Sequence, residues 1–143
     1  MSRETYYAAL FSVLDGLRVA GTVKVVTRRF SLQDAAKPQV LPAIHIDGDR
    51  EEVTCRPGLP PRRRLSVRLF AYVAVDVSRD LAGVVLSAMI DTIEAVLAPI
   101  PSQSTQTLGG ICAHCWIEGT IERFETGLPG MALAIIPVHI LVP

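Results

Sequence analysis

The chain has 143 residues, of which 50% are hydrophobic and 20% are charged. This length and composition predict one domain, residues 1–143, with enough apolar side chains for a sizeable core. No apolar run reaches the roughly 18–20 residues of a membrane-spanning helix, and the N-terminus lacks a signal-peptide pattern. We therefore expect a soluble protein, made inside the cell, with no membrane partner.

The formal net charge is zero, which argues against nonspecific nucleic-acid binding as the main task. The distribution is uneven, however. Residues 1–80 contain 13 basic and 9 acidic residues, a net charge of +4, whereas residues 81–143 contain 1 and 5, a net charge of −4. This division suits a protein that meets copies of itself or two different partners.

The N-terminal part predicts one helix and two strands. Apolar residues at helical spacing indicate a helix over Glu4–Leu17, with Ser2 as its N-cap. The β-branched run Val23–Phe30 predicts a short strand, and residues 31–39 predict a loop. A second strand is expected over Leu41–Ile46, ending at the turn signal Asp47-Gly48-Asp49.

Residues 49–64, DREEVTCRPGLPPRRR, combine charges with three prolines and a turn signal at Pro57-Gly58. Pro60-Pro61 disfavours both a helix and a central strand. The segment is either a mobile loop or a long hairpin that leads into the next strand. Loops of this length without structure of their own are usually functional or disordered.

The stretch Arg62–Val77, RRRLSVRLFAYVAVDV, organises the rest of the chain. From Leu65 onward its residues alternate, which predicts a long strand with one aliphatic face. The other face mixes charged and aromatic residues. The aliphatic face comprises Leu65, Val67, Leu69, Ala71, Val73, Val75 and Val77, and the opposite face comprises Ser66, Arg68, Phe70, Tyr72, Ala74 and Asp76.

The C-terminal part predicts a second helix, begun by Ser78 or Asp80 and ending near Ala98, then two strands. The first strand covers Ala113–Arg123 and the second covers Met131–Val142, which is apolar on both faces. Pro137 removes a ladder donor, so we expect this last strand at an edge or bulged, facing a partner chain.

Together these elements predict an α+β fold. Its mixed, mainly antiparallel sheet has about four to five strands, two helices pack on one face, and a long charged loop or hairpin extends from it.

Cys112-Ala113-His114-Cys115 is the most distinctive chemical motif, since a C-x-x-C can be a redox pair or half of a zinc site. Cys112, His114 and Cys115 are therefore weak metal candidates. No further ligand spacing accompanies them, and His45 and His139, in the middle of strands, are better explained as hydrogen-bonded structural histidines. We expect no catalytic residue and no cofactor; a small metal- or thiol-dependent enzyme is the alternative from another class.

Interaction residues are expected at the charged extension and on the mixed strand face. Three consecutive arginines can bind phosphate or an acidic protein surface, but a solvated hairpin root and a protein contact are both favoured over DNA. The aromatic face also suits a ligand-binding module. The expected interface residues are Arg56, Arg62, Arg63, Arg64, Arg68, Phe70, Tyr72 and Trp116.

The order of elements and several short sequence segments resemble those of a known protein family. After the N-terminal helix and a short β pair come PPRRRLSVRLFAYV (60–73), the helix IDTIEAVLAP (90–99), QTLGG with CAHCWIEGTIE (106–122), and ALAIIPVHILVP (132–143). In this pattern the chain resembles the tail terminator (minor tail, tail completion) proteins of long-tailed bacteriophages and prophages.

The resemblance implies a small structural protein, not an enzyme, that forms a hexameric ring in the virion. Such a ring caps the growing tail tube, stops its polymerisation and presents a surface to the head-side connector. It implies a homo-oligomer with a tail tube protein and a head–tail connector as partners, assembled in the bacterial cytoplasm. A head–tail connector or neck protein is the alternative within this class.

Overall fold

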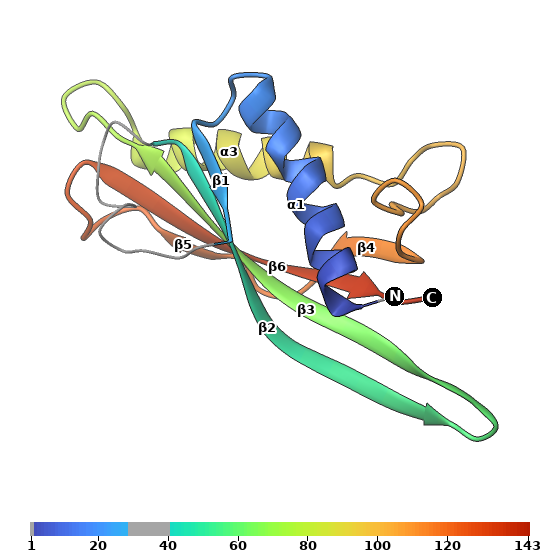
Figure 1. The fold of residues 1–143 in the computed structure, drawn as a ribbon. Coiled ribbons are helices and arrows are strands. Elements are labelled where there is room, and N and C mark those ends of the chain that lie inside the picture. Colours follow the sequence, from blue (N-terminus) through green and yellow to red (C-terminus); the bar gives the residue numbers. More distant parts are fainter. Residues whose placement is uncertain (1, 29–40) are drawn as a thin grey trace.

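The computed structural model describes residues 2–28 and 41–143. Within them the chain forms two helices and one six-stranded sheet (Figure 1). The predicted loop at 31–39 and the end of the predicted strand Val23–Phe30 lie outside the described residues. The elements are α1 (Arg3–Val19), β1 (Val25–Thr27), β2 (Ala43–Arg56), β3 (Leu59–Ala74), α3 (Ala82–Val96), β4 (His114–Ile117), β5 (Glu122–Phe124) and β6 (Met131–Leu141).

The sheet has the order β1-β2-β3-β6-β4, and β5 pairs with β6 beside β4. β1 runs parallel to β2, and the other pairs are antiparallel. Both helices contribute to one hydrophobic core with the same side of the strands. The predicted α+β class, with a mainly antiparallel sheet and helices on one face, is therefore confirmed.

The core forms where the alternation of β3 predicts it. The aliphatic side chains of β3 from Leu65 to Val73 are buried against both helices. They meet Leu10 and Leu14 of α1 and Leu86 and Ile93 of α3, all fully buried. The prediction of the aliphatic face is wrong at one residue. Val77 lies beyond the end of β3 and is 85% exposed.

The start of α3 differs from the prediction. Leu81 occupies the N-cap position, and no side chain makes a capping hydrogen bond there. The Asp80 carboxylate instead accepts from the backbone N–H of Asp76, and the Asp76 carboxylate accepts from the backbone N–H of Ser78, both at 3.0 Å. Ser78 and Asp80 therefore close the preceding turn and are not available as helix caps.

β2 is much longer than predicted. Asp47-Gly48-Asp49 does not end the strand; the ladder with β3 continues past it after a register shift between Gly48 and Arg50. A bulge of this kind absorbs one extra residue while the strand goes on. Two alternatives were predicted for residues 49–64, a mobile loop and a long hairpin, and the structure shows the hairpin.

The strand predicted over Ala113–Arg123 is divided into β4 and β5, and β6 is not at an edge. β6 lies between β3 on one side and the two short strands on the other. The Pro137 carbonyl accepts from the Glu118 N–H at 3.4 Å, so the missing N–H of this proline points toward β4 and β5. That donor is missing where β4 has ended and β5 has not begun, which is why a proline is tolerated inside the sheet.

Candidate functional site

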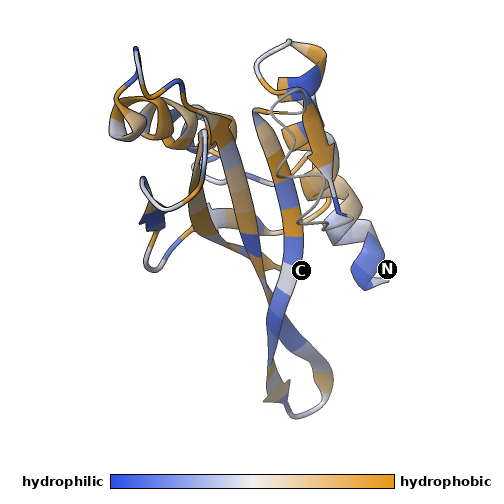
Figure 2. Ribbon diagram, turned by 90° about the vertical axis from the view of Figure 1, so that its left-hand side faces the viewer, coloured by the Kyte–Doolittle hydropathy of each residue, from blue (hydrophilic) through white to orange (hydrophobic). Residues whose placement is uncertain are grey.

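The most prominent feature outside the core is a projecting hairpin arm, residues 52–63. The pairing of β3 with β6 ends at Arg64 and Leu141, whereas the pairing of β2 with β3 continues to Arg56 and Leu59. The arm therefore extends past the rest of the sheet as a two-stranded ribbon (Figures 1 and 2). Nearly all of its side chains are exposed, including Val53 and Leu59.

A tight turn and one hydrogen bond shape the tip of the arm. Pro57 and Gly58 form a two-residue connection in which Gly58 has a φ of +76°, so the turn needs a residue without a Cβ. The Arg56 Nε donates to the Pro60 carbonyl at 2.9 Å. The turn signal at Pro57-Gly58 is thus confirmed.

The arm is anchored at its root by one carboxylate. Glu51 receives the Arg3 Nε at 2.8 Å and the Arg63 Nη1 at 3.0 Å. Hydrogen bonds first from Arg3 and then from Arg63 lower the pKa of the Glu51 carboxyl. These contacts connect the arm to the first turn of α1.

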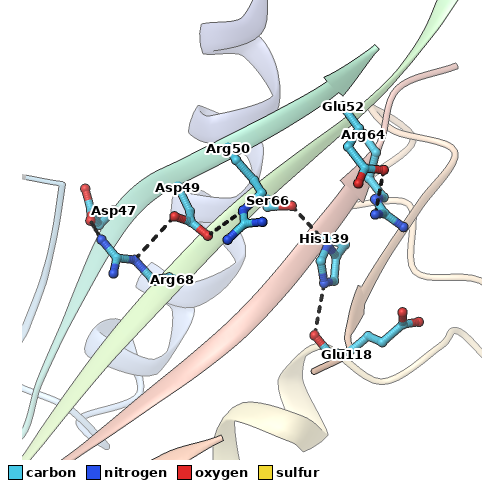
Figure 3. A network of polar contacts seen from close by, with 9 residues as sticks. All are labelled: Asp47, Asp49, Arg50, Glu52, Arg64, Ser66, Arg68, Glu118 and His139. Atoms are coloured by element: carbon cyan, nitrogen blue, oxygen red, sulfur yellow. Dashed lines mark hydrogen bonds and ion pairs between the residues drawn. The ribbon is translucent and has the colours of Figure 1, made fainter. Parts of the chain in front are cut away.

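The predicted arginine cluster is divided. Arg63 and Arg64 are both paired inside the chain. Arg63 pairs with Glu51 at 3.0 Å, and Figure 3 shows the pair of Arg64 with Glu52 at 2.6 Å. Arg62 is exposed and makes no ion pair with any residue in the described ranges. Of the three consecutive arginines, only Arg62 is free to contact a partner.

The helix-free face of the sheet is less open than predicted. Arg68 donates to Asp47 at 2.8 Å (Figure 3). Its guanidinium also lies over the Phe70 ring, 5.4 Å from the ring centroid. Tyr72 is buried in a second small cluster and packs edge-on against His45. Phe70 packs partly buried against the same cluster, so Phe70 and Tyr72 do not form an exposed aromatic surface.

Trp116 lies on β4, separated from Phe70 and Tyr72 by β6. Its ring makes stacked contacts with His114, at 5.1 Å between ring centroids, and with His139, at 5.4 Å, and its Nε1 donates to the Glu118 carboxylate at 3.1 Å. The predicted aromatic face is therefore two separate groups. A single ligand platform formed by Phe70, Tyr72 and Trp116 is not present.

Ser66 and His139, on this face of the sheet, resemble a nucleophile and a base. The Ser66 hydroxyl lies 3.2 Å from Nδ1 of His139, and Nε2 of His139 donates to the Glu118 carbonyl at 2.9 Å (Figure 3). Both ring nitrogens are thereby used, and Ser66 is buried. The arrangement ties β3, β6 and the end of β4 together and is better explained as structural.

The cysteine motif lies in the core. Cys112 and Cys115 are buried, and burial raises the pKa of Cys112 to about 11 and that of Cys115 to about 12. A thiolate is the reactive and metal-binding form of cysteine, and it is disfavoured at neutral pH here. The His114 Nδ1 accepts from the Gln106 N–H, and no three candidate ligands group together in residues 2–28 and 41–143. This geometry does not favour the metal or thiol alternative.

A groove at the start of α3, opposite the arm along β3, was not predicted. It consists of two adjoining hollows of about 580 and 840 Å³ that share Leu81, Ala82, Glu125 and Thr126. Val77, Leu81 and Val84 are exposed by 85%, 74% and 65%. The sequence signal for it is the apolar stretch Leu81–Val85 at the start of the predicted second helix, where helical spacing does not distinguish an exposed groove from core.

The groove is also acidic. Asp80, Asp91 and Glu125 line it together with one basic residue, Arg123. The Arg123 guanidinium donates to the Gly83 carbonyl and the Ser87 hydroxyl, each at 3.0 Å, and lies 3.8 Å from the Glu125 carboxylate. Asp80 and Asp91 therefore account for the net negative charge of the groove. We call this surface the α3 groove.

Neither helix in the described part of the chain is long and apolar enough to cross a membrane. No protein-family model matches the chain, and no curated protein does. The two surfaces that stand out, the arm and the α3 groove, are both suited to contacts with other proteins.

Proposed function

We propose that the chain is a structural, non-catalytic assembly protein of phage tails, which forms a homo-oligomeric ring and acts as the terminator of the tail tube. The observation that carries the proposal is the arm. A two-stranded ribbon is marginally stable in water by itself, because it has no core of its own. An arm held out from the fold by Glu51 is best explained as a surface that another protein covers.

The arrangement of surfaces supports a ring. Closed rings use heterologous contacts, in which two different patches of each subunit meet. The chain has two such regions at opposite ends of β3, the arm around Leu59 and the α3 groove around Leu81 (Figure 1). The resemblance of residues 60–73 and 106–122 to tail terminators supplies the biological setting and the expectation of six subunits.

In this function the ring covers the last layer of tube subunits and thereby stops the addition of more. Its other side meets the head-side connector. Neither role needs a reactive group, which agrees with the buried thiols of Cys112 and Cys115 and the fully used ring of His139.

The test combines mass measurement with imaging. Light scattering gives the mass of the purified protein alone and mixed with the tail tube protein encoded beside it, and negative-stain images show whether rings form on tube ends. Rings of about six subunits at tube ends support the terminator. Rings that bind the connector but not the tube support the head–tail connector alternative, and a strict monomer in both samples contradicts the proposal.

A further inference from the structure

The arm ends in a mixture of apolar and basic groups. Leu59 is 63% exposed, and Pro60 and Pro61 follow it on the same strand. The guanidinium of Arg62 is free within the described residues, and that of Arg56 contacts only the Pro60 carbonyl. The tip therefore presents an apolar centre beside positive charge.

The α3 groove presents the complementary chemistry. Its apolar part is formed by Val77, Leu81 and Val84, whose side chains are largely exposed. Its acidic part includes Asp91, on an exposed position of α3 in the larger hollow. Exposed apolar side chains gathered around a hollow are unusual in a protein that acts alone, and they mark a surface that a partner covers.

We propose that the arm of one subunit docks into the α3 groove of the next copy of this chain. This inference rests on the proposed function, since it names the contact that builds the ring. Leu59 packs between Leu81 and Val84 of the neighbour, and Arg62 lies close to the acidic side of that groove. The occupant is a second copy because the charges of the two surfaces are opposite.

The position of the two surfaces requires the contact to be between subunits. The arm lies at the start of β3, and Val77 follows the end of the same strand. β3 has 16 residues, which at about 3.3 Å per residue separates its ends by roughly 50 Å. An arm therefore cannot reach its own groove, and each subunit gives one arm and receives another.

The chemistry of the arm favours docking by side chains and not by strand addition. Pro60 and Pro61 have no backbone N–H to donate to an added strand. The ladder with β2 also shifts register between Thr54 and Arg56, which leaves Cys55 unpaired near the tip. The prolines interrupt the β3 edge of the arm and the shift at Cys55 interrupts the β2 edge, so each edge is a poor template for pairing, whereas the side chains of the arm remain exposed.

Cross-linking tests the contact, because the chain already has one exposed thiol at the tip of the arm. Cys55 is exposed, whereas Cys112 and Cys115 are buried. In a Val84→Cys variant of the full-length chain, a short bis-maleimide is expected to join Cys55 of one subunit to the new thiol of the next. Because every subunit has both positions, the products should form a ladder on a denaturing gel up to the full oligomer.

Two controls make the result specific. Val19→Cys places a thiol at a residue that is 75% exposed but outside the α3 groove, and it should add no ladder. Val84→Cys combined with Cys55→Ser should lose the ladder. Peptide mapping then identifies the cross-linked pair.

The outcomes separate this inference from the proposed function. A ladder in Val84→Cys that depends on Cys55 supports the docking. An oligomer by light scattering in which Val84→Cys cross-links no more than Val19→Cys overturns the docking and leaves the ring in place. A monomer by light scattering, without a ladder, overturns both.

Discussion

Nη1 of Arg63 lies 3.0 Å from Oε1 of Glu51, across the two strands at the root of the arm. The same carboxylate receives Arg3 of α1 at 2.8 Å. This relationship fixes the arm to the body of the domain. It also means that one of the predicted interface arginines has a structural task.

Replacing Glu51 with Gln removes the charge that holds Arg3 and Arg63. Surface pairs of this kind contribute less than about 1 kcal/mol each, so a small fall in melting temperature is expected at pH 7. The pKa of Glu51 is lowered in the fold, so its stabilisation is present above the ordinary carboxyl pKa and is lost as the pH falls through the lowered pKa. The melting temperatures of the two proteins should therefore converge in acid.

Glu52→Gln is the matched control, since Glu52 pairs with Arg64 alone. Its effect on melting temperature at pH 7 should be smaller than that of Glu51→Gln. A difference between wild type and Glu51→Gln that stays constant from neutral to strongly acidic pH contradicts the assignment.

Two valines near the end of β3 have opposite environments, so replacing each with aspartate should change the free energy of unfolding by different amounts. Val73 is 1% exposed in the core, so Val73→Asp buries an unpaired charge and should cost at least about 4 kcal/mol. Val77→Asp should leave the free energy of unfolding nearly unchanged, because Val77 is exposed. Urea denaturation measures both, and equal destabilisation contradicts the structure.

Much of this division is visible in the sequence. The alternation from Leu65 to Val73 predicts the buried face of β3, because side chains on a strand alternate regardless of what lies beside it. The same rule fails at Val77, since the strand has already ended at Ala74. Helical spacing likewise predicts α1 and the buried stripe of α3, including Leu86 and Ile93.

What the sequence does not predict depends on neighbouring strands. Tyr72 is buried because Ala43 and Leu133 are its strand partners, which no local pattern shows. Pro137 suggests an edge, yet its missing donor faces the interval between β4 and β5. The arm is one of two interpretations of the proline-rich segment 49–64, the other being a loop. The α3 groove is not predicted, because Leu81 fits the helical spacing of the residues that follow it.

Gly119 lies against the ring of Pro137 at this same interval. Its φ is +117°, and a Cβ there would come within 3.2 Å of the proline Cγ. Gly119→Ala should therefore destabilise the fold by more than about 1 kcal/mol. Gly16→Ala in α1, where nothing lies within 4 Å, should instead stabilise it by about 0.5–1 kcal/mol. Thermal denaturation of both variants checks the signs.

Thiol titration tests the burial of the cysteine motif. One thiol per chain, Cys55, should react promptly with Ellman's reagent in the native protein, and three should react in denaturant. The raised pKa values of Cys112 and Cys115 slow their reaction further at neutral pH. Prompt reaction of a native Cys55→Ser variant would support the thiol alternative and contradict this account.

Arg62 and Arg63 should behave differently although they are adjacent. Arg62→Glu removes a free guanidinium, so the melting temperature should stay the same while self-association weakens by about 1 kcal/mol, roughly fivefold. Arg63→Glu places two carboxylates together at the root of the arm and should lower the melting temperature. Equal loss of stability in both variants contradicts the division of the arginine cluster.

The central claim is that the arm builds a homo-oligomer, and a shortened arm tests it most directly. Glu52 and Arg64 are register partners whose backbone groups face each other, since the Arg63 carbonyl faces β6, so Asn-Gly can replace residues 53–63 and close a two-residue hairpin between them. Sedimentation equilibrium should give the mass of an oligomer for the wild type and the mass of a folded monomer for the shortened chain. An unchanged oligomer mass without the arm would contradict the account.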